Sequence, residues 1–304
     1  MLRFSKVGRG SWSIVGASAL WGTTGVATQV LYNLSGTNAL TLAFLRLAIA
    51  GCVLFVLCWR LLGMRMWRMK RSDLLLMLLM GVMQAFFQFG YLAAIPECGV
   101  TIATLVALCV APVIVVLYAA LFMRERLTVK IVLALLCALA GTVLLMGGPT
   151  GHETSGNLLL GVLLALVSAA GYAGVILAGR TLSSRCHPLQ INTISFGMGT
   201  ILLLVGALST HLALSYSVSG WLLVLYLGFI PTALAYMLFQ SGLRSTSATL
   251  TSILTLGEPL TATVLAWFLF GERLNALGIL GALLLCGTLL LLAQGNATDT
   301  LASA

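Results

Sequence analysis

The sequence predicts an all-α integral membrane protein in which ten transmembrane helices form two inverted repeats of five, with both termini in the cytoplasm. Three observations predict this fold class: an apolar composition, the confinement of basic residues to alternate loops, and a match between the two halves of the chain. Of the 304 residues, 60% are hydrophobic and only 8% are charged, and the mean hydropathy is +1.10. A soluble surface needs roughly a quarter charged residues, so a water-soluble protein of this composition is excluded.

Ten apolar stretches, separated by polar or charged breaks, define the expected helices, because one crossing takes about 20 residues. In chain order they cover residues 12–32, 38–62, 73–95, 99–123, 128–147, 156–178, 188–210, 217–243, 246–270 and 274–293. No residues remain for a soluble catalytic domain, which excludes most classes of enzyme. The first stretch is expected to stay in the mature chain, because Thr23, Thr24 and Gln29 interrupt it and no small-residue cleavage motif follows.

The distribution of lysine and arginine sets the predicted orientation, because short cytoplasmic loops are enriched in these residues. Fourteen of the sixteen lie at the N-terminus or in the loops after the second, fourth, sixth and eighth predicted helices. Of the other two, Arg273 lies on the opposite side and Arg46 lies inside a helix. Both termini are therefore expected in the cytoplasm, with residues 151–154 outside. The same distribution accounts for the net charge of +9. Binding of nucleic acid is not expected, since no basic patch with interleaved aromatic residues occurs.

The two halves of the chain are related by a shift of 147 residues. This shift lays the segment APVIVVLYAALFMRERL on EPLTATVLAWFLFGERL without a gap, so that Pro112 meets Pro259 and Glu125 meets Glu272. Many transporters are built from two repeats of inverted topology. We expect a first five-helix repeat at residues 1–148 and a second at residues 149–304. The second repeat is expected to be inverted, because five crossings return the chain to the opposite side.

Three short motifs are typical of a known family. The first helix carries ALWG, the second carries FLR, and each half has a proline followed 13 residues later by Glu-Arg-Leu. In these features the whole chain resembles the EamA family of the drug/metabolite transporter superfamily. The resemblance implies a bacterial inner-membrane exporter of amino acids or other small metabolites, working by alternating access through a cavity between the two halves. The first half departs from the second in carrying Ala111 where Glu258 precedes the proline, and the resemblance does not specify a substrate.

Two charged residues lie deep inside predicted helices, where a charge costs about 2.5–3.5 kcal/mol. At 1.5 Å per residue, Arg46 lies about 12 Å and Glu258 about 18 Å from the outer ends of their helices, so the two side chains can meet. In one interpretation Glu258 binds a substrate ammonium group or a proton, and Arg46 is its partner or binds a substrate carboxylate. In the other interpretation they form a structural ion pair between the halves. The sequence leaves both open.

Three prolines are expected to kink helices, because proline removes a backbone hydrogen bond and clashes with the preceding turn. Pro112 and Pro259 occupy equivalent positions in the two halves, and interruptions at such positions point to a binding site near the membrane midplane. Pro231 has no counterpart in the first half, where the shift lands on Gln84. Ordinary packing kinks are the alternative for all three.

Polar and aromatic residues at helical spacing predict the wall of a substrate pathway. In residues 73–95, for example, four of them stand at positions i, i+3, i+4 and i+7, which share one helix face. The predicted pathway residues are Trp21, Thr28, Arg46, Gln84, Phe87, Gln88, Tyr91, Tyr172, Tyr236, Gln240 and Glu258. Such a wall suits a small zwitterion with an apolar or aromatic side chain. For any one stripe, hydrogen bonding between packed helices is the alternative.

The sequence favours a secondary transporter or facilitator that exports small metabolites, with amino acids favoured and nucleosides, amines or drugs as alternatives. No P-loop or catalytic motif occurs, so no catalytic residue and no cofactor are expected, and a membrane-embedded enzyme is less favoured. A structural subunit would not need the buried Arg46 and Glu258. The seven cysteines and three histidines lack metal-ligand spacing, so no metal site is expected. The expected partners are a small-molecule substrate and membrane lipid.

Overall fold

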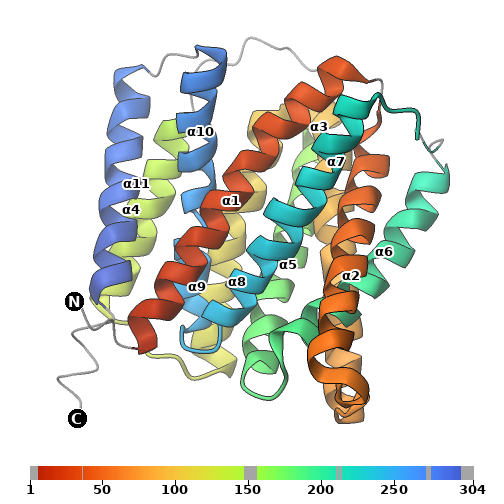
Figure 1. Ribbon diagram of the computed structural model, residues 1–304. Coiled ribbons are helices and arrows are strands. Elements are labelled where there is room, and N and C mark those ends of the chain that lie inside the picture. The colour runs from red at the N-terminus through yellow and green to blue at the C-terminus, as the bar shows by residue number, and fades with distance from the viewer. Residues whose placement is uncertain are drawn as a thin grey trace.

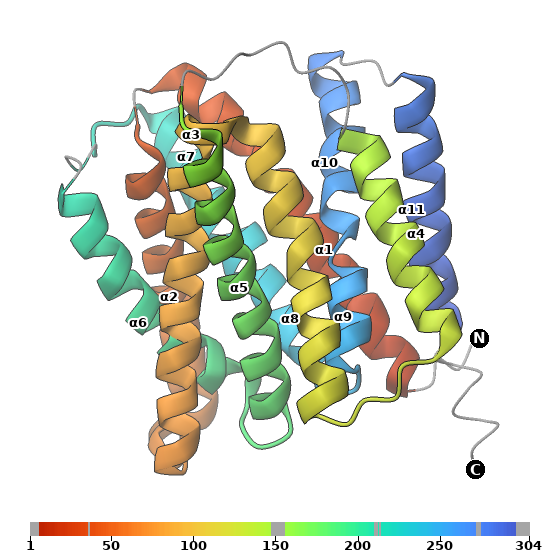
Figure 2. The same ribbon diagram turned by 180° about the vertical axis from the view of Figure 1, so that it is seen from behind.

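A computed structural model describes residues 6–35, 37–146, 156–209, 212, 214–271 and 275–295, and every element in these ranges is helical (Figure 1). In chain order the elements are α1 (Lys6–Leu34), α2 (Ala39–Leu62), η1 (Gly63–Trp67), α3 (Arg71–Phe122), α4 (Val129–Met146), α5 (Leu158–Ser183), α6 (Pro188–Ser209), α7 (Val218–Gly228), η2 (Phe229–Leu234), α8 (Ala235–Gly242), α9 (Ala248–Leu254), α10 (Gly257–Phe270) and α11 (Ala276–Gly295). The helices form one bundle, in which α1 starts and α11 ends at the same end (Figures 1 and 2).

Nine helical stretches in the described ranges are long and apolar enough to cross a membrane, and the chain is a multi-pass integral membrane protein. Three of these stretches are composite, and the first of them, Ala39–Trp67, is formed by α2 and η1. The elements α7, η2 and α8 together form Val218–Gly242, and α9 and α10 together form Ala248–Leu269. The sequence predicted ten crossings, and the difference from nine lies in α3, which contains both the third and the fourth predicted stretch.

The 52-residue α3 is a helical hairpin rather than one straight helix. At 1.5 Å per residue it measures about 78 Å, more than twice the roughly 30 Å of a bilayer core. Its backbone leaves the helical region at Gly99, where φ is 81° and ψ is 159°, a conformation that glycine adopts without a steric penalty. The first part of α3 rises and its second part descends beside it (Figure 2). The arrangement of ten crossings as five plus five, with both termini inside, stays a prediction.

One end of the bundle collects the connections that follow α2, α3, α5 and α8, together with the start of α1 (Figure 1). These connections carry most of the arginine and lysine residues that the sequence assigned to the cytoplasm. Arg185, in the connection after α5, forms an ion pair of 3.3 Å with Asp73 near the start of α3. We call this end of the bundle the basic end.

The helices pack mainly as α3 with α5 and α6, α2 with α6, α4 with α11, and α1 with α8 and α10. Small residues permit the closest approaches, as is usual for helices in membranes. A Cβ atom at Gly281 would lie 2.6 Å from the backbone nitrogen of Leu145, so a larger residue would push α11 away from α4. The largest group of buried apolar residues surrounds Trp21, Phe196 and Phe239 and joins α1, α6 and α8 at the centre of the bundle.

Candidate functional site

A central cavity of about 460 Å³ lies among α1, α2, α3, α5, α8 and α10. Pockets of about 300–1,000 Å³ are typical of small-molecule sites. Nine of the eleven predicted pathway residues line it, namely Trp21, Thr28, Arg46, Phe87, Gln88, Tyr91, Tyr172, Tyr236 and Glu258. The chain therefore brings residues from both halves of the sequence to one cavity.

Aromatic rings from four helices form one side of this cavity. The ring of Trp21 lies edge-on to Tyr236, with centroids 5.0 Å apart, and edge-on to Tyr172 at 6.4 Å. Phe87 stacks on Tyr172 with centroids 5.0 Å apart. Edge-on and offset stacked geometries are the favourable ones for aromatic pairs. The rings hold one another in place and present an apolar surface to the cavity.

The other two predicted pathway residues, Gln84 and Gln240, lie behind the cavity wall. Gln84 is almost fully buried, and its Nε2 donates a hydrogen bond of 2.8 Å to the hydroxyl of Tyr236. Gln240 is fully buried, and its Nε2 donates to the carbonyl of Gly179 at 2.8 Å. Gln84 thus orients a cavity tyrosine, whereas Gln240 joins α8 to α5.

Arg46 on α2 and Glu258 on α10 both face the cavity, and each lies within electrostatic range of the other. They do not form an ion pair: within the described residues, the one pair with an N···O distance below 4.0 Å joins Arg185 to Asp73. The Nε atom of Arg46 is buried and has no hydrogen-bond partner in the described part of the chain. Unpaired charges in the membrane interior are costly, so both side chains are candidates for contact with a ligand.

Glu258 and Pro259 lie at a break between two helices. α9 ends at Leu254, α10 begins at Gly257, and both residues belong to the first turn of α10. Proline fits a first turn because the N–H groups there have no partner within the helix, and a carboxylate is favourable near that positive end. Gly22 of α1 packs against this turn, since a Cβ there would lie 2.7 Å from the carbonyl oxygen of Glu258.

The other two prolines have different local structures. Pro231 lies in η2, a π-helical segment, and cannot donate to the carbonyl of Leu227. The hydroxyl of Thr232 donates to that carbonyl instead, at 2.7 Å, which satisfies it inside the bundle. At Pro112 the backbone dihedrals of α3 stay helical. Of the two equivalent prolines, only Pro259 adjoins a helix break.

The cavity wall also contains residues that the sequence did not single out as pathway residues. Tyr32 follows the predicted pathway residue Thr28 by four residues, so the two share one helix face and the spacing could have pointed to it. Thr104 lies beyond the Gly99 turn, and its hydroxyl is 2.9 Å from that of Tyr91. The contact between Tyr91 and Thr104 depends on how α3 folds back at Gly99, and residue spacing does not reveal this.

The cavity extends away from the basic end of the bundle. Its wall includes Tyr32 near the end of α1, Ala39 at the start of α2 and Val100 beside the α3 turn. At the basic end, side chains tie neighbouring segments together; for example, Arg180 donates to the carbonyl of Leu243 at 2.7 Å. The cavity is therefore further from the basic end than from the opposite one.

A membrane-spanning bundle around a cavity lined by aromatic and charged residues is the architecture of a small-molecule transporter. Comparison with known proteins agrees: the chain matches the EamA-like transporter family over residues 8–147 and 159–294. It is 31% identical over 296 residues to YwfM, an uncharacterized transporter of Bacillus subtilis, with 93% of this chain and 94% of that protein covered. An uncharacterized transporter of Archaeoglobus fulgidus is also 31% identical, over 295 residues, with 95% and 98% covered.

The uncharacterized inner membrane transporter YicL of Salmonella typhimurium is 29% identical over 293 residues, with 93% of this chain and 95% of that protein covered. A protein of known crystal structure has the same fold, with a TM-score of 0.78 at 22% identity over 98% of this chain and 99% of the other. The protein belongs to the EamA-like transporter family. The family and these relatives support a membrane transporter rather than an enzyme.

Proposed function

We propose that the protein is a secondary transporter or facilitator that exports small zwitterionic metabolites across the bacterial cytoplasmic membrane, with amino acids that carry aromatic or apolar side chains as its preferred substrates. The observation that carries this proposal is that Arg46 and Glu258 face one cavity without pairing. A guanidinium group binds carboxylates well, and a carboxylate binds an ammonium group. An amino acid supplies both groups and removes both unpaired charges at once.

The remaining wall favours an apolar or aromatic side chain on this substrate. Trp21, Phe87 and Tyr172 offer ring surfaces, while Gln88 and Thr28 add a few hydrogen-bonding groups. Ligand sites commonly combine mostly apolar surface with a small number of placed polar groups. A nucleotide would need more positive charge than Arg46 alone provides.

Two features support an architecture of two inverted repeats, residues 1–148 and 149–304, with alternating access between them. The shift of 147 residues lays Val129, which starts α4, on Ala276, which starts α11. It also lays Arg71, the first residue of α3, on Val218, the first residue of α7. The family match has two segments of similar length. The basic end then faces the cytoplasm, since short basic loops stay on that side.

Amines, nucleosides and drugs are the competing substrates, and they place different demands on the two charges. A simple amine needs Glu258 but gains nothing from Arg46. A nucleoside carries neither charge, so it would leave both unpaired. Of these substrate classes, only a zwitterion is certain to supply a partner for both Arg46 and Glu258.

Counterflow in proteoliposomes tests the proposal. Vesicles preloaded with phenylalanine should accumulate labelled phenylalanine, while phenylalaninamide, which lacks the carboxylate, and N-acetylphenylalanine, which lacks the ammonium group, should compete poorly. In Arg46→Gln, phenylalanine and its amide should compete with more similar strength than in the parent protein, because the residue that binds the carboxylate is lost. Arg60→Gln is a matched control, since Arg60 lies in the last turn of the same helix α2.

Three outcomes separate the alternatives. Equal competition by phenylalanine and its amide would point to an amine transporter. Counterflow with nucleosides but not with amino acids would contradict the zwitterion proposal. An unchanged preference in Arg46→Gln, together with normal counterflow, would remove Arg46 from the substrate site.

A further inference from the structure

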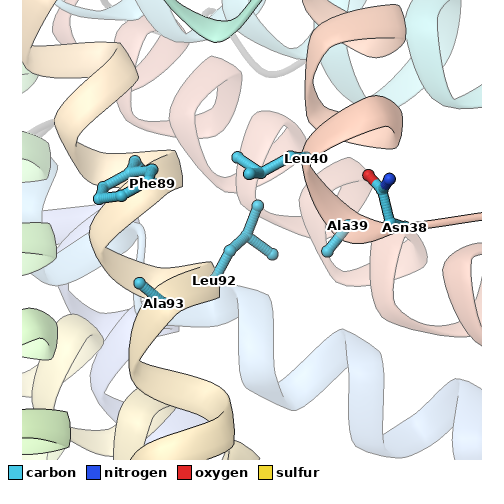
Figure 3. A pocket seen from close by; sticks show the side chains of 6 residues that line it. All are labelled: Asn38, Ala39, Leu40, Phe89, Leu92 and Ala93. Atoms are coloured by element: carbon cyan, nitrogen blue, oxygen red, sulfur yellow. The ribbon is translucent and has the colours of Figure 1, made fainter. Parts of the chain in front are cut away.

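A second hollow, of about 210 Å³, lies between the start of α2 and the last turns of α3 before the Gly99 break (Figure 3). Its wall is formed by Asn38, Ala39, Leu40, Phe89, Leu92 and Ala93. Two of these six residues, Ala39 and Leu92, also line the central cavity. The two spaces therefore share a wall made of one methyl group and one leucine side chain. We call the second hollow the side groove.

The side groove is apolar and faces outward from the bundle. Phe89 is 47% exposed, and Phe86, one turn earlier on the same helix, is 49% exposed, so this face of α3 meets lipid. The one polar residue of the groove is Asn38, whose Oδ1 accepts a hydrogen bond of 2.7 Å from the backbone N–H of Thr41 and so caps α2. That bond uses the side-chain oxygen of Asn38 for the helix rather than for a ligand.

The backbones of α2 and α3 approach each other closely at few points along the seam between the groove and the cavity. α2 packs mainly against α6 and only weakly against α3. The side chains of Leu40 and Leu92 project into the space between α2 and α3, and Ala39 beside them is small (Figure 3). Leucine side chains can change rotamer within nanoseconds when they are partly exposed. Of the two residues in the shared wall, Leu92 is the one whose rotamer change would widen the seam while the helix backbones stay in place.

The groove and the charged site are separated by a defined distance along α2. Ala39 precedes Arg46 by seven residues on α2, which is two turns and about 10 Å along the same helix face. A ligand whose carboxylate is bound by Arg46 reaches Ala39 only if it has an extended chain of several carbon atoms. A short side chain stays inside the central cavity.

We propose that the side groove accepts the alkyl end of an amphiphilic substrate whose zwitterionic head lies between Arg46 and Glu258, so that the transporter handles α-amino acids with long aliphatic chains. This inference rests on the proposed function and extends it to a substrate class. The shared wall at Ala39 and Leu92 connects head and tail sites, and the apolar groove provides a lining of matching chemistry. Entry from the lipid side becomes available to such a substrate through the same seam.

The test is a chain-length series in proteoliposomes. Counterflow of labelled leucine is inhibited with 2-aminohexanoate, 2-aminooctanoate and 2-aminodecanoate, and inhibition constants are compared between the parent protein and variants. Each methylene that enters the groove should tighten inhibition by about fourfold, from a burial energy of about 0.8 kcal/mol per methylene. In Ala93→Phe the added ring fills the groove without touching the central cavity, because Ala93 lines only the groove. In this variant inhibition should no longer become tighter as the chain lengthens, and leucine counterflow should stay normal.

Two further variants control this comparison. Leu79→Phe adds an aromatic ring to a lipid-exposed site on the same helix, outside the groove, and should retain the full chain-length dependence. Phe89→Ala enlarges the groove, so inhibition should continue to tighten for longer chains than in the parent protein. This variant keeps the test decisive if Ala93→Phe folds poorly. Because every variant meets the same vesicles, partition of the long amino acids into lipid cancels from the comparison.

Two results would overturn the inference. Equal inhibition constants across the series in the parent protein, with normal leucine counterflow, would contradict the tail site while leaving the proposed function intact. A bilayer acyl chain that permanently fills the groove would give this result. Absence of counterflow with any amino acid would contradict the proposed function itself, and the tail site with it.

Discussion

The carboxylate of Glu125 accepts a hydrogen bond of 2.9 Å from the backbone N–H of Ala248, and a second of 3.1 Å from that of Thr249. Glu125 follows α3 in the first half of the chain, whereas Ala248 is the first residue of α9 in the second half. Ser247 caps the same helix through a bond of 3.1 Å to the N–H of Leu250. The Glu125 contact thus joins the two halves at the basic end, beside the helix that leads to Glu258.

Removal of the Glu125 carboxylate should loosen this end of the bundle. Glu125→Ala leaves two N–H groups at the start of α9 without an acceptor, and loss of a helix cap costs about 0.5–2 kcal/mol. We expect a lower unfolding temperature in detergent and faster alkylation of a single cysteine placed at Thr251, which is fully buried in α9. The labelling is measured in a background without the seven native cysteines.

Glu125→Gln is the control, because its amide oxygen can still accept one of the two bonds. It should fall between the parent and Glu125→Ala in both measurements. Identical unfolding temperatures and labelling rates in all three proteins would show that the contact does not hold the halves together.

The orientation of the chain can be tested on a residue outside the described ranges. His152 lies in the connection that the sequence places outside the cell, whereas Arg68 lies in the connection after η1, at the basic end. A single cysteine at His152 should react with a membrane-impermeant maleimide on intact cells, and one at Arg68 should react only after the cells are opened. The reverse pattern would contradict the predicted cytoplasmic termini.

Gln88 and Tyr91 share one face of α3, and their environments predict different effects. Both line the cavity, but the Tyr91 hydroxyl is bonded to Thr104 across the α3 hairpin. Tyr91→Phe removes that bond and should lower stability by about 1 kcal/mol. Gln88→Ala should weaken transport of large apolar amino acids while the unfolding temperature stays unchanged. A Gln88→Ala protein that unfolds earlier but transports normally would assign Gln88 to helix packing.

His187 is expected to make the stability of the start of α6 depend on pH. Its Nδ1 accepts a bond of 3.3 Å from the N–H of Leu189, and its own N–H donates to the side chain of Gln190 at 3.0 Å. Burial lowers the pKa of His187 below the usual value of 6.5, and the charge of Arg244 lowers it further. The unfolded chain therefore binds the proton more tightly, so stability is lost as the pH falls below about 6.5.

The measurement is the unfolding temperature between pH 7.5 and pH 5.5. His187→Asn supplies an acceptor at this position that does not titrate, so this variant should show a shallower decline than the parent. Equal slopes for the two proteins would mean that other groups cause the pH dependence.

Much of the fold follows from the sequence because membrane-spanning helices need long apolar runs. The stretch predicted at 188–210 corresponds to α6 at Pro188–Ser209, and the stretch at 217–243 corresponds to α7, η2 and α8 at Val218–Gly242. The internal structure of the composite spans does not follow in the same way. The break before Glu258 and the π-helical segment at Pro231 depend on contacts such as the Thr232 hydroxyl bond.

The candidate site was accessible to sequence reasoning where a residue is both unusual and periodic. Arg46 and Glu258 stand out because charges are rare inside membrane helices, and Tyr91 lies on a regular stripe. The same stripe includes Gln84, which lies behind Tyr236 rather than in the cavity. Spacing defines a helix face but not which part of that face borders a cavity and which part borders another helix. The side groove depends on packing between α2 and α3, which no periodic pattern encodes.

The separation of Arg46 and Glu258 predicts how Glu258→Gln will behave. A structural ion pair would make this variant unstable, and neutralising Arg46 as well would restore stability. Because the two residues do not pair, we expect Glu258→Gln to fold normally and to lose affinity for amino acids by about tenfold or more, as one charged hydrogen bond is worth about 1.5–3 kcal/mol. The measurements are the unfolding temperature and the concentration dependence of phenylalanine counterflow.

The response to a pH gradient then separates substrate binding from proton coupling at Glu258. If Glu258 carries the proton, Glu258→Gln retains exchange between preloaded and external amino acid but no longer accumulates substrate when a pH gradient is imposed. If Glu258 only binds the ammonium group, the gradient has the same relative effect on the parent and the variant, and only the affinity differs. Glu97→Gln is a matched control, because Glu97 bonds the N–H of Asn157 at the far end of the bundle and does not line the cavity. Unchanged affinity and an unchanged pH response in Glu258→Gln would remove Glu258 from both roles.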